Sequence, residues 1–205
     1  MPRTSTARER LTEAALKRIW SYSYGASSVD AICEEAKVKK GSFYYFFKSK
    51  SELAAAALEA DWKKNRAQLD RIFSPTVPPL ERFERYFEFS LQRMVEVEQE
   101  CGCVLGCPLY ALGSEICTRD TVLRNKIQEI LDRKMTYFES AIRDAHAEGL
   151  IVAPDAKTKA KTLFLFIQGG LTLARIQNNL DVLRDSYRGA LDLLGATDLP
   201  ALSQP

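Results

Sequence analysis

The eight prolines of this 205-residue sequence divide it into a few long segments. They stand near the two ends, between residues 75 and 79, at Pro108 and at Pro154. A proline inside a helix removes a backbone hydrogen bond and clashes with the preceding turn, so helices end where prolines occur. The segments between them are rich in Ala, Leu, Glu, Lys and Arg, which favour helix. The sequence therefore predicts an all-α protein of about nine helices.

Apolar residues at helical spacing predict four helices at the start of the chain. The first runs from Thr6 to Trp20, and the second is short and ends near Lys37. The third covers "KGSFYYFF", and the fourth covers "SELAAAALEADWKKNRAQLDRIF" up to the prolines.

Two capping boxes mark helix starts within this region. Ser27 and Asp30 have the spacing of a box that would begin the second helix. Ser49 and Glu52 have the same spacing, and Glu52 is expected to accept from the Ser49 amide at the start of the fourth.

Farther along the chain, longer patterns predict helices over residues 80–100, 121–148 and 181–194. The segment "KTLFLFIQGGLTLARIQ" is apolar on nearly every side, so it is expected to be a helix that is covered all round.

Charge divides the chain unevenly. The first 50 residues contain ten Lys and Arg against five Asp and Glu, whereas the other 155 contain 19 against 22. A basic segment joined to a mildly acidic body is typical of a nucleic-acid-binding module on a second domain. A solvated cationic surface would give the same counts, so the charge indicates nucleic-acid binding only together with a motif.

Two short helices joined by a tight turn, the second basic at its start, are the pattern of a helix-turn-helix. Phe43 and Phe47 are four residues apart and are expected to face the core. Tyr44, Tyr45 and Lys48 then point outward, where hydroxyl and ammonium groups can donate to phosphate oxygens. From the spacing alone, a plain helical hairpin with a solvated lysine face is the alternative.

The segment "SSVDAICEEAKVKKGSFYYFFKSKSEL" closely resembles the DNA-binding segment of the TetR family of bacterial transcriptional regulators. The resemblance implies an all-helical homodimer that binds a double-stranded DNA operator. It implies residues 1–50 as the helix-turn-helix DNA-binding domain and residues 51–205 as a ligand-binding and dimerisation domain. By position, it assigns DNA binding to Ser28, Lys39, Lys40, Gly41, Ser42, Tyr44, Tyr45, Lys48 and Lys50.

Three positions depart from the family pattern. Lys37 stands where Gly or Asn is usual, Lys39 stands where Ser or Thr usually caps the helix, and Phe46 stands where His or Tyr is common. A lysine at a helix start costs about 0.3 to 1 kcal/mol through the helix dipole, and a nearby phosphate reverses that cost. We therefore expect Lys39 to contact the DNA backbone.

The resemblance also implies a transcriptional repressor that a small, largely apolar effector releases from DNA. The candidate effector contacts are Trp62, Phe87, Tyr110, Glu115, Phe164 and Gln168. Each aromatic side chain alone is more typical of core packing than of an effector contact, and Glu115 is more typical of an exposed carboxylate at a helix end.

Gly169 and Gly170 lie inside an apolar helix, where they allow another helix to approach closely. With Tyr187 in the last helix, they are the predicted dimer interface, in which each subunit contributes two helices.

Cys101, Cys103 and Cys107 allow three interpretations: apolar filling, sensing of electrophiles or oxidants, or a thiol enzyme. Zinc is disfavoured because paired Cys-x2-Cys spacings are absent and His146 is the only histidine. The sequence has no phosphate loop or dinucleotide fingerprint, so we predict neither an enzyme nor a cofactor nor a metal. A nonspecific DNA-packaging protein is a further alternative.

The chain has no run of about 20 apolar residues, the length needed to cross a membrane. Its start, "MPRTSTARER", lacks the apolar core of a signal peptide. We therefore expect a cytoplasmic protein with no membrane partner.

Overall fold

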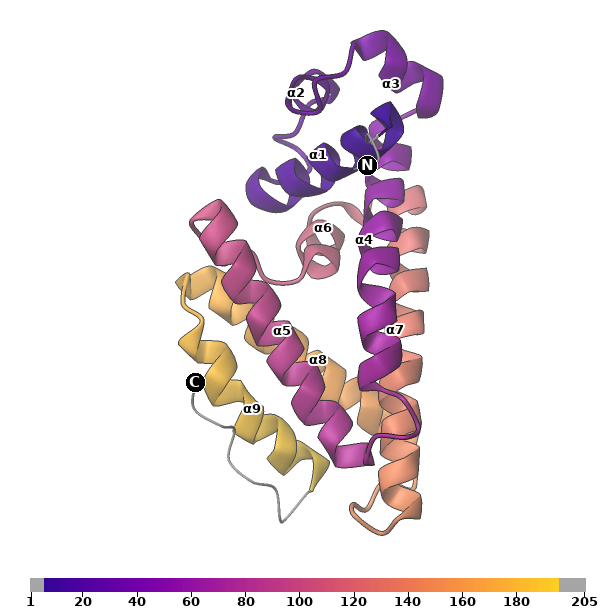
Figure 1. The fold of residues 1–205 in the computed structure, drawn as a ribbon, viewed down its shortest axis with the longest axis vertical. Helices are drawn as coiled ribbons and strands as arrows, with labels where there is room; N and C mark the ends of the chain where they lie inside the picture. Colours follow the sequence, from indigo (N-terminus) through magenta and orange to yellow (C-terminus); the bar gives the residue numbers. More distant parts are fainter. Residues whose placement is uncertain (1–5, 196–205) are drawn as a thin grey trace, which may run out of the picture. The chain divides into compact units, whose positions relative to one another are not determined.

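The computed structural model describes residues 6–195, and this part of the chain contains nine α-helices and no strand, as predicted. The helices are α1 (Ala7–Tyr22), α2 (Val29–Glu35), α3 (Lys40–Phe46), α4 (Lys50–Ile72), α5 (Pro79–Cys101), α6 (Pro108–Ile116), α7 (Thr121–Ala147), α8 (Ala156–Gln177) and α9 (Asp181–Leu194) (Figure 1). None of the helices in residues 6–195 is both long enough and apolar enough to cross a bilayer.

Two of the prolines begin helices. Pro79 and Pro108 are the first residues of α5 and α6, a position where the missing N–H has no intrahelical partner to lose. Gly102 caps the end of α5 with a φ of 74°, a left-handed conformation that glycine adopts without steric cost.

The chain packs into two compact units, which we describe separately. Within the described residues, the first contains 6–65 and 108–131, and the second contains 66–107 and 132–195. Helices α4 and α7 each contribute residues to both units. The predicted domains, residues 1–50 and 51–205, remain a prediction.

In the first unit, α1, α2 and α3 pack around one apolar core. Phe43 and Phe47 are buried there, together with Leu11 and Ile32. The neighbouring Tyr45 is 83% exposed. The aromatic run therefore has a buried face and an exposed face, as its helical spacing predicts.

The helix starts differ from the sequence prediction in two places. Ser28, not Ser27, caps α2 by accepting from the Ala31 amide, while Ser27 is fully buried and donates to the Ser23 carbonyl at 2.7 Å. Glu52 accepts from the amide of Lys48 at 2.8 Å, one residue before the predicted donor.

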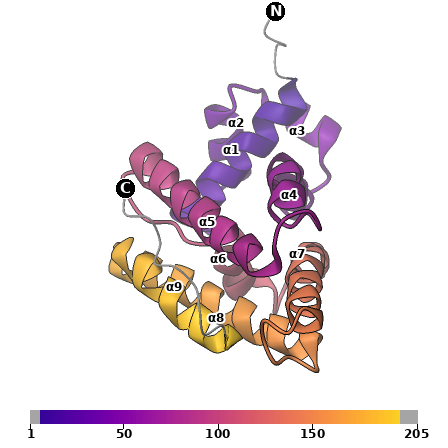
Figure 2. The ribbon, with the colours of Figure 1, turned by 60° about the horizontal axis from the view of Figure 1, so that its bottom comes forward.

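In the second unit, α8 and α9 lie side by side, with α5 against them (Figure 2). Gly170 permits the close approach of α9, because a Cβ there would lie 3.2 Å from the Ser186 hydroxyl. Gly189 on α9 has the same effect, since its Cβ would lie 2.9 Å from the Phe166 ring. These small residues bring the two helices together within one protomer.

A buried ion pair supports the second unit. Arg82 on α5 is 2% exposed and pairs with Asp144 on α7 at 2.5 Å. Its guanidinium also donates to the Val77 carbonyl at 2.8 Å. Because a buried charge needs partners for its donors, this arrangement fixes the start of α5 against α7.

We predict that Lys37→Gly stabilises the protein. Lys37 has a φ of 52°, a left-handed conformation that costs a residue with a Cβ about 1 to 2 kcal/mol. Glycine removes that cost, but it lowers the free energy of unfolding by about 0.5 to 1 kcal/mol because the unfolded chain becomes more flexible. The free energy of unfolding should therefore rise by up to about 1 kcal/mol.

Chemical denaturation of both proteins measures the change. The control is Lys64→Gly at an exposed position inside α4, which should lower the free energy of unfolding by about 1 kcal/mol. Equal losses in both variants would show that the conformation of Lys37 carries no strain.

Candidate nucleic-acid interface

The exposed side of α3 carries the residues that the sequence assigns to DNA binding. Tyr44 is 60% exposed, and Lys48 follows the helix at an exposed position. Ser42 is half-buried, whereas Phe46 lies with its ring 4.9 Å from that of Tyr45. A Cβ at Gly41 would meet no atom within 4 Å, so the start of α3 is open to close approach. This surface can present hydroxyl and ammonium donors to a phosphate backbone.

Two lysines begin α3. Lys39 occupies the cap position, and its side chain makes no capping hydrogen bond. The ammonium of Lys40 lies 2.7 Å from a carboxylate oxygen of Asp30 on α2. The hydrogen bond to Asp30 raises the pKa of Lys40. Because both side chains are exposed, water and salt weaken this pair, and a phosphate can replace Asp30 as the partner of Lys40.

Lys50 has a structural role beside its predicted contact with phosphate. Its ammonium donates to the Tyr24 carbonyl at 2.8 Å and lies 4.0 Å from the centre of the Tyr24 ring. Burial lowers the pKa of Lys50. The first residue of α4 is therefore attached to the turn that follows α1.

The same turn is held from α6 by Glu115. One carboxylate oxygen accepts from the Tyr24 amide at 2.8 Å, and the other accepts from the Gly25 amide at 2.7 Å. The Tyr24 hydroxyl lies 3.0 Å from that of Ser51, which in turn bonds to Asp120 before α7. We call these residues the Tyr24 network. It joins α1, α4, α6 and α7 within the first unit and uses both oxygens of Glu115.

Two segments of the chain match families of known proteins. Residues 11–57 match the family described as bacterial regulatory proteins, tetR family. Residues 79–190, more than half of the chain, match the tetracyclin repressor-like C-terminal domain. The chain belongs to the TetR family. It is a DNA-binding transcriptional regulator, and the match to residues 11–57 covers the helix-turn-helix described above.

Individual TetR-family relatives are similar to this chain over most of their length. The transcriptional regulator AcuR of Cereibacter sphaeroides is 26% identical over 189 residues, which cover 91% of this chain and 84% of that protein. The HTH-type transcriptional repressor DhaR of a Mycobacterium species is 28% identical over 184 residues, 86% of each chain. A crystal structure of a regulatory protein TetR from Rhodobacter sphaeroides has a TM-score of 0.79 and 26% identity, covering 91% of this chain and 97% of that one.

The predicted effector contacts are divided between the two units. Trp62 is buried and Tyr110 half-buried in the first unit, where Glu115 belongs to the Tyr24 network. In the second unit, Phe164 and Gln168 are buried on α8. The carboxylate of Glu115 is thus already engaged by the backbone amides of Tyr24 and Gly25.

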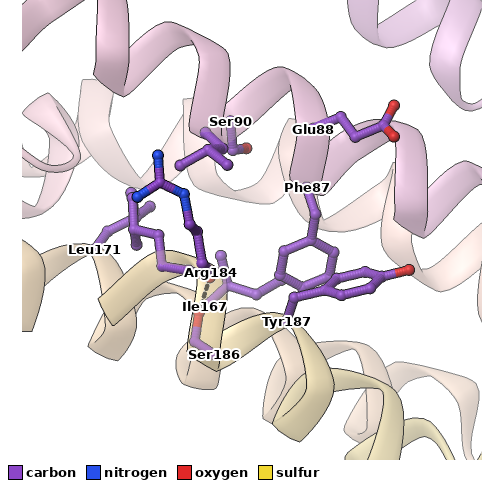
Figure 3. A pocket seen from close by; sticks show the side chains of 10 residues that line it. Phe87, Glu88, Ser90, Ile167, Leu171, Arg184, Ser186 and Tyr187 are labelled. Atoms are coloured by element: carbon purple, nitrogen blue, oxygen red, sulfur yellow. Dashed lines mark hydrogen bonds between the residues drawn. The ribbon is translucent and has the colours of Figure 1, made fainter. Parts of the chain in front are cut away.

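Phe87 lines a cavity of about 100 Å³ between α5, α8 and α9. Figure 3 shows Phe87 and Tyr187 together at one side of this cavity and Leu171 and Arg184 at the other. Tyr187, predicted at the dimer interface, is only 5% exposed; its ring lies 5.0 Å from that of Phe87 and its hydroxyl donates to Glu84. The structure therefore buries Tyr187 inside the protomer.

The five cysteines are all free thiols. Cys107 is buried, and Cys101 and Cys103 are half-buried near the end of α5. Burial raises the pKa of Cys33 and of Cys117, which opposes formation of the reactive thiolate at these two positions. Within residues 6–195, no three His, Cys, Asp or Glu side chains group together in a way that could hold a metal ion.

Sequence reasoning did not identify Asp30, Tyr24 or Asp120 as parts of this interface. Asp30 was interpreted only as a capping residue, although this acid in the first turn of α2 reaches Lys40 at the start of α3. The contacts of Tyr24 and Asp120 join residues far apart in the chain, such as Tyr24 and Glu115, and no local pattern indicates them.

We predict that Asp30→Asn strengthens binding to any DNA duplex. The substitution removes a negative charge beside α3 and releases Lys40 from its ion pair. Affinity should rise several-fold at low salt, and the slope of log affinity against log salt should steepen by about one. Fluorescence anisotropy with a labelled duplex at several salt concentrations measures both.

The matched control is Glu13→Gln, which makes the same change in net charge at an exposed position on α1. If both variants raise affinity equally, total charge explains the effect and the local role of Asp30 is refuted.

Proposed function

We propose that this regulator is a repressor, and that it reads an operator with the exposed side of α3. The observation that carries this proposal is the division of one helix into buried Phe43 and exposed Tyr44 and Tyr45. The buried ring anchors α3 to the core, while the two hydroxyls and nearby lysines face outward. The similarity to the transcriptional repressor DhaR supports repression over activation.

Seven of the nine predicted DNA contacts divide into three roles. Tyr44, Tyr45 and Ser42 lie along α3 and are placed to approach base edges in a major groove. Lys39, Lys40 and Lys48 lie at the two ends of α3 and serve as phosphate contacts. Ser28 caps α2, so its contribution is to position that helix.

The active form is a homodimer formed through α8. Leu165, Phe166, Leu173 and Ile176 leave an apolar strip exposed on this helix, and Ile176 is 74% exposed. Gly169 lies within the strip, with nothing within 4 Å of a Cβ built there, so another helix can approach it closely. A second copy would remove the strip from water and place two recognition helices about one turn of DNA apart. Gly170 and Tyr187 support this face from inside the protomer.

A small effector releases the repressor from DNA in the cytoplasm. The match of residues 79–190 to a repressor-like C-terminal domain supports a sensing role for the second unit. An effector acts only if it binds more tightly to a conformation that cannot hold DNA. Helices α4 and α7, which contribute residues to both units, are continuous helical connections through which this change can pass.

We predict different effects of Tyr45→Ala and Lys48→Ala on operator binding. Tyr45→Ala should lower affinity and also change the preferred sequence, because this position is nearest to base edges. Lys48→Ala should weaken binding to all sequences alike and reduce the salt slope by about one. Selection from a random duplex library, followed by salt titration, measures both. Lys50 is unsuitable for this comparison because it also holds Tyr24.

Lys64→Ala, at an exposed position farther along α4, is the control and should leave both quantities unchanged. A wild-type protein that bound random duplex and selected duplex equally at physiological salt would contradict the proposed function. It would support nonspecific packaging of DNA instead.

A further inference from the structure

The interior of the second unit contains a polar side chain with no partner. Gln168 on α8 is 1% exposed, and neither its amide nitrogen nor its amide oxygen has a hydrogen-bond partner among residues 6–195. An unsatisfied buried polar group costs about 1 to 3 kcal/mol, and native proteins contain few of them. A glutamine in this position requires a partner that the folded chain itself does not supply.

Three aromatic rings from three helices surround the same interior. The ring of Phe138 on α7 lies 4.9 Å from that of Tyr86 on α5 and 5.4 Å from that of Phe164 on α8. Both contacts are edge-to-face, at 81° and 88°. These three rings form what we call the aromatic layer. They show which positions of α5, α7 and α8 lie at the same height in the unit.

One helical turn from this layer, each helix carries a polar residue. Ser90 follows Tyr86 by four residues, Gln168 follows Phe164 by four, and Lys134 precedes Phe138 by four. In Figure 1 the colours show that α5 and α8 run in one direction while this part of α7 runs in the opposite one. Four residues span about 6 Å along a helix axis, so each polar residue lies about that far along its helix from the aromatic residue. Because of the helix directions, all three polar residues lie on the same side of the aromatic layer. We call Ser90, Lys134 and Gln168 the polar layer.

The charges around this layer are positive. Burial raises the pKa of Tyr86, so its phenol is a neutral hydroxyl, and it bonds to Ser90. Lys134 and Arg93 are the positively charged side chains that act on the Tyr86 hydroxyl and oppose this rise, whereas the Cys107 thiol adds to it. Lys134 itself forms no ion pair within residues 6–195. The interior thus combines apolar rings with positive charge and an amide that needs a partner.

We propose that the polar layer binds the carboxylate of a small organic acid whose apolar body lies against the aromatic layer. The amide N–H groups of Gln168 and the hydroxyl of Ser90 donate to the carboxylate, and Lys134 balances its charge. The amide oxygen is left for a hydroxyl or a water molecule that enters with the acid. This inference rests on the proposed effector response and names the chemical class of the effector.

Matched pairs of acids and uncharged amides test this assignment: benzoate with benzamide, phenylacetate with phenylacetamide, and hexanoate with hexanamide. Thermal unfolding of the full chain is followed against the concentration of each compound. At least one acid should raise Tm progressively with concentration, as binding to the native state requires. Its amide should bind at least about tenfold more weakly, because it lacks the charge that Lys134 attracts.

Two variants locate the binding. Lys134→Gln and Gln168→Leu should each weaken binding of that acid by about tenfold or more, the loss expected for a hydrogen bond to a charged group. The controls, Lys161→Gln and Gln177→Leu, make the same substitutions at exposed positions of α8 and should bind as the wild type does. Gln168→Leu is not expected to unfold the protein, since it replaces an unsatisfied amide by an apolar group of similar size.

Three results would overturn the inference. These are amides that bind as well as their acids, a full response in Lys134→Gln and Gln168→Leu, and a panel in which no acid raises Tm. Operator binding by the protein without added compounds is measured in parallel. A protein that binds its operator but responds only to uncharged compounds retains the proposed function and refutes the carboxylate. A protein that binds no specific operator refutes the proposed function itself.

Discussion

The position of α3, the proposed recognition helix, depends on one carboxylate that accepts two backbone hydrogen bonds. Glu115 binds the amides of Tyr24 and Gly25, in the turn between α1 and α2. Hydrogen bonds to a charged acceptor are stronger than neutral ones, and two of them fix the direction of the turn as well as its place. A Cβ at Gly25 would lie 3.2 Å from Glu115, so the fit leaves little room for movement.

The remaining contacts of the Tyr24 network extend this constraint to α4. Lys50 donates to the carbonyl of Tyr24, and Glu115 accepts from the amide of the same residue. Both backbone polar groups of Tyr24 are therefore held by side chains. Ser51 joins the Tyr24 hydroxyl to Asp120, which also accepts from the Leu123 amide and caps the start of α7. Helices α2 and α3 are therefore supported at both ends, by the turn before α2 and by the start of α4. Any conformational change that shifts α6 must break or carry these bonds.

The sequence was most informative where the signal is local. Helical spacing placed Phe43 in the core and Tyr45 in solvent, because the period of a helix alone determines which residues share a face. The left-handed conformation of Lys37 explains why glycine or asparagine is usual at that position, although the sequence alone showed only the departure. Long-range contacts were not predictable. Glu115 was proposed as an effector contact, yet its partners are backbone amides ninety residues away, and amides carry no sequence signature.

The same limit applies to the second unit. Gly169 and Gly170 were both assigned to a dimer interface, but they lie on different sides of α8. Gly170 faces α9 of its own protomer, whereas Gly169 faces open space. Gln168 was identified as an effector contact, whereas Ser90 and Lys134 were not. Their relation to Gln168 depends on how three helices align, and the aromatic contacts of Phe138 reveal that alignment only in the folded protein.

The central claim is that α3 and the residues beside it form the DNA-binding surface. Hydrogen–deuterium exchange of the full chain, with and without a duplex selected for tight binding, tests it most directly. We predict that the duplex slows exchange of the amides at Gly41, Ser42 and the following residues of α3, while α9 exchanges as before. Unchanged exchange throughout α3, together with protection elsewhere in the chain, would contradict this assignment.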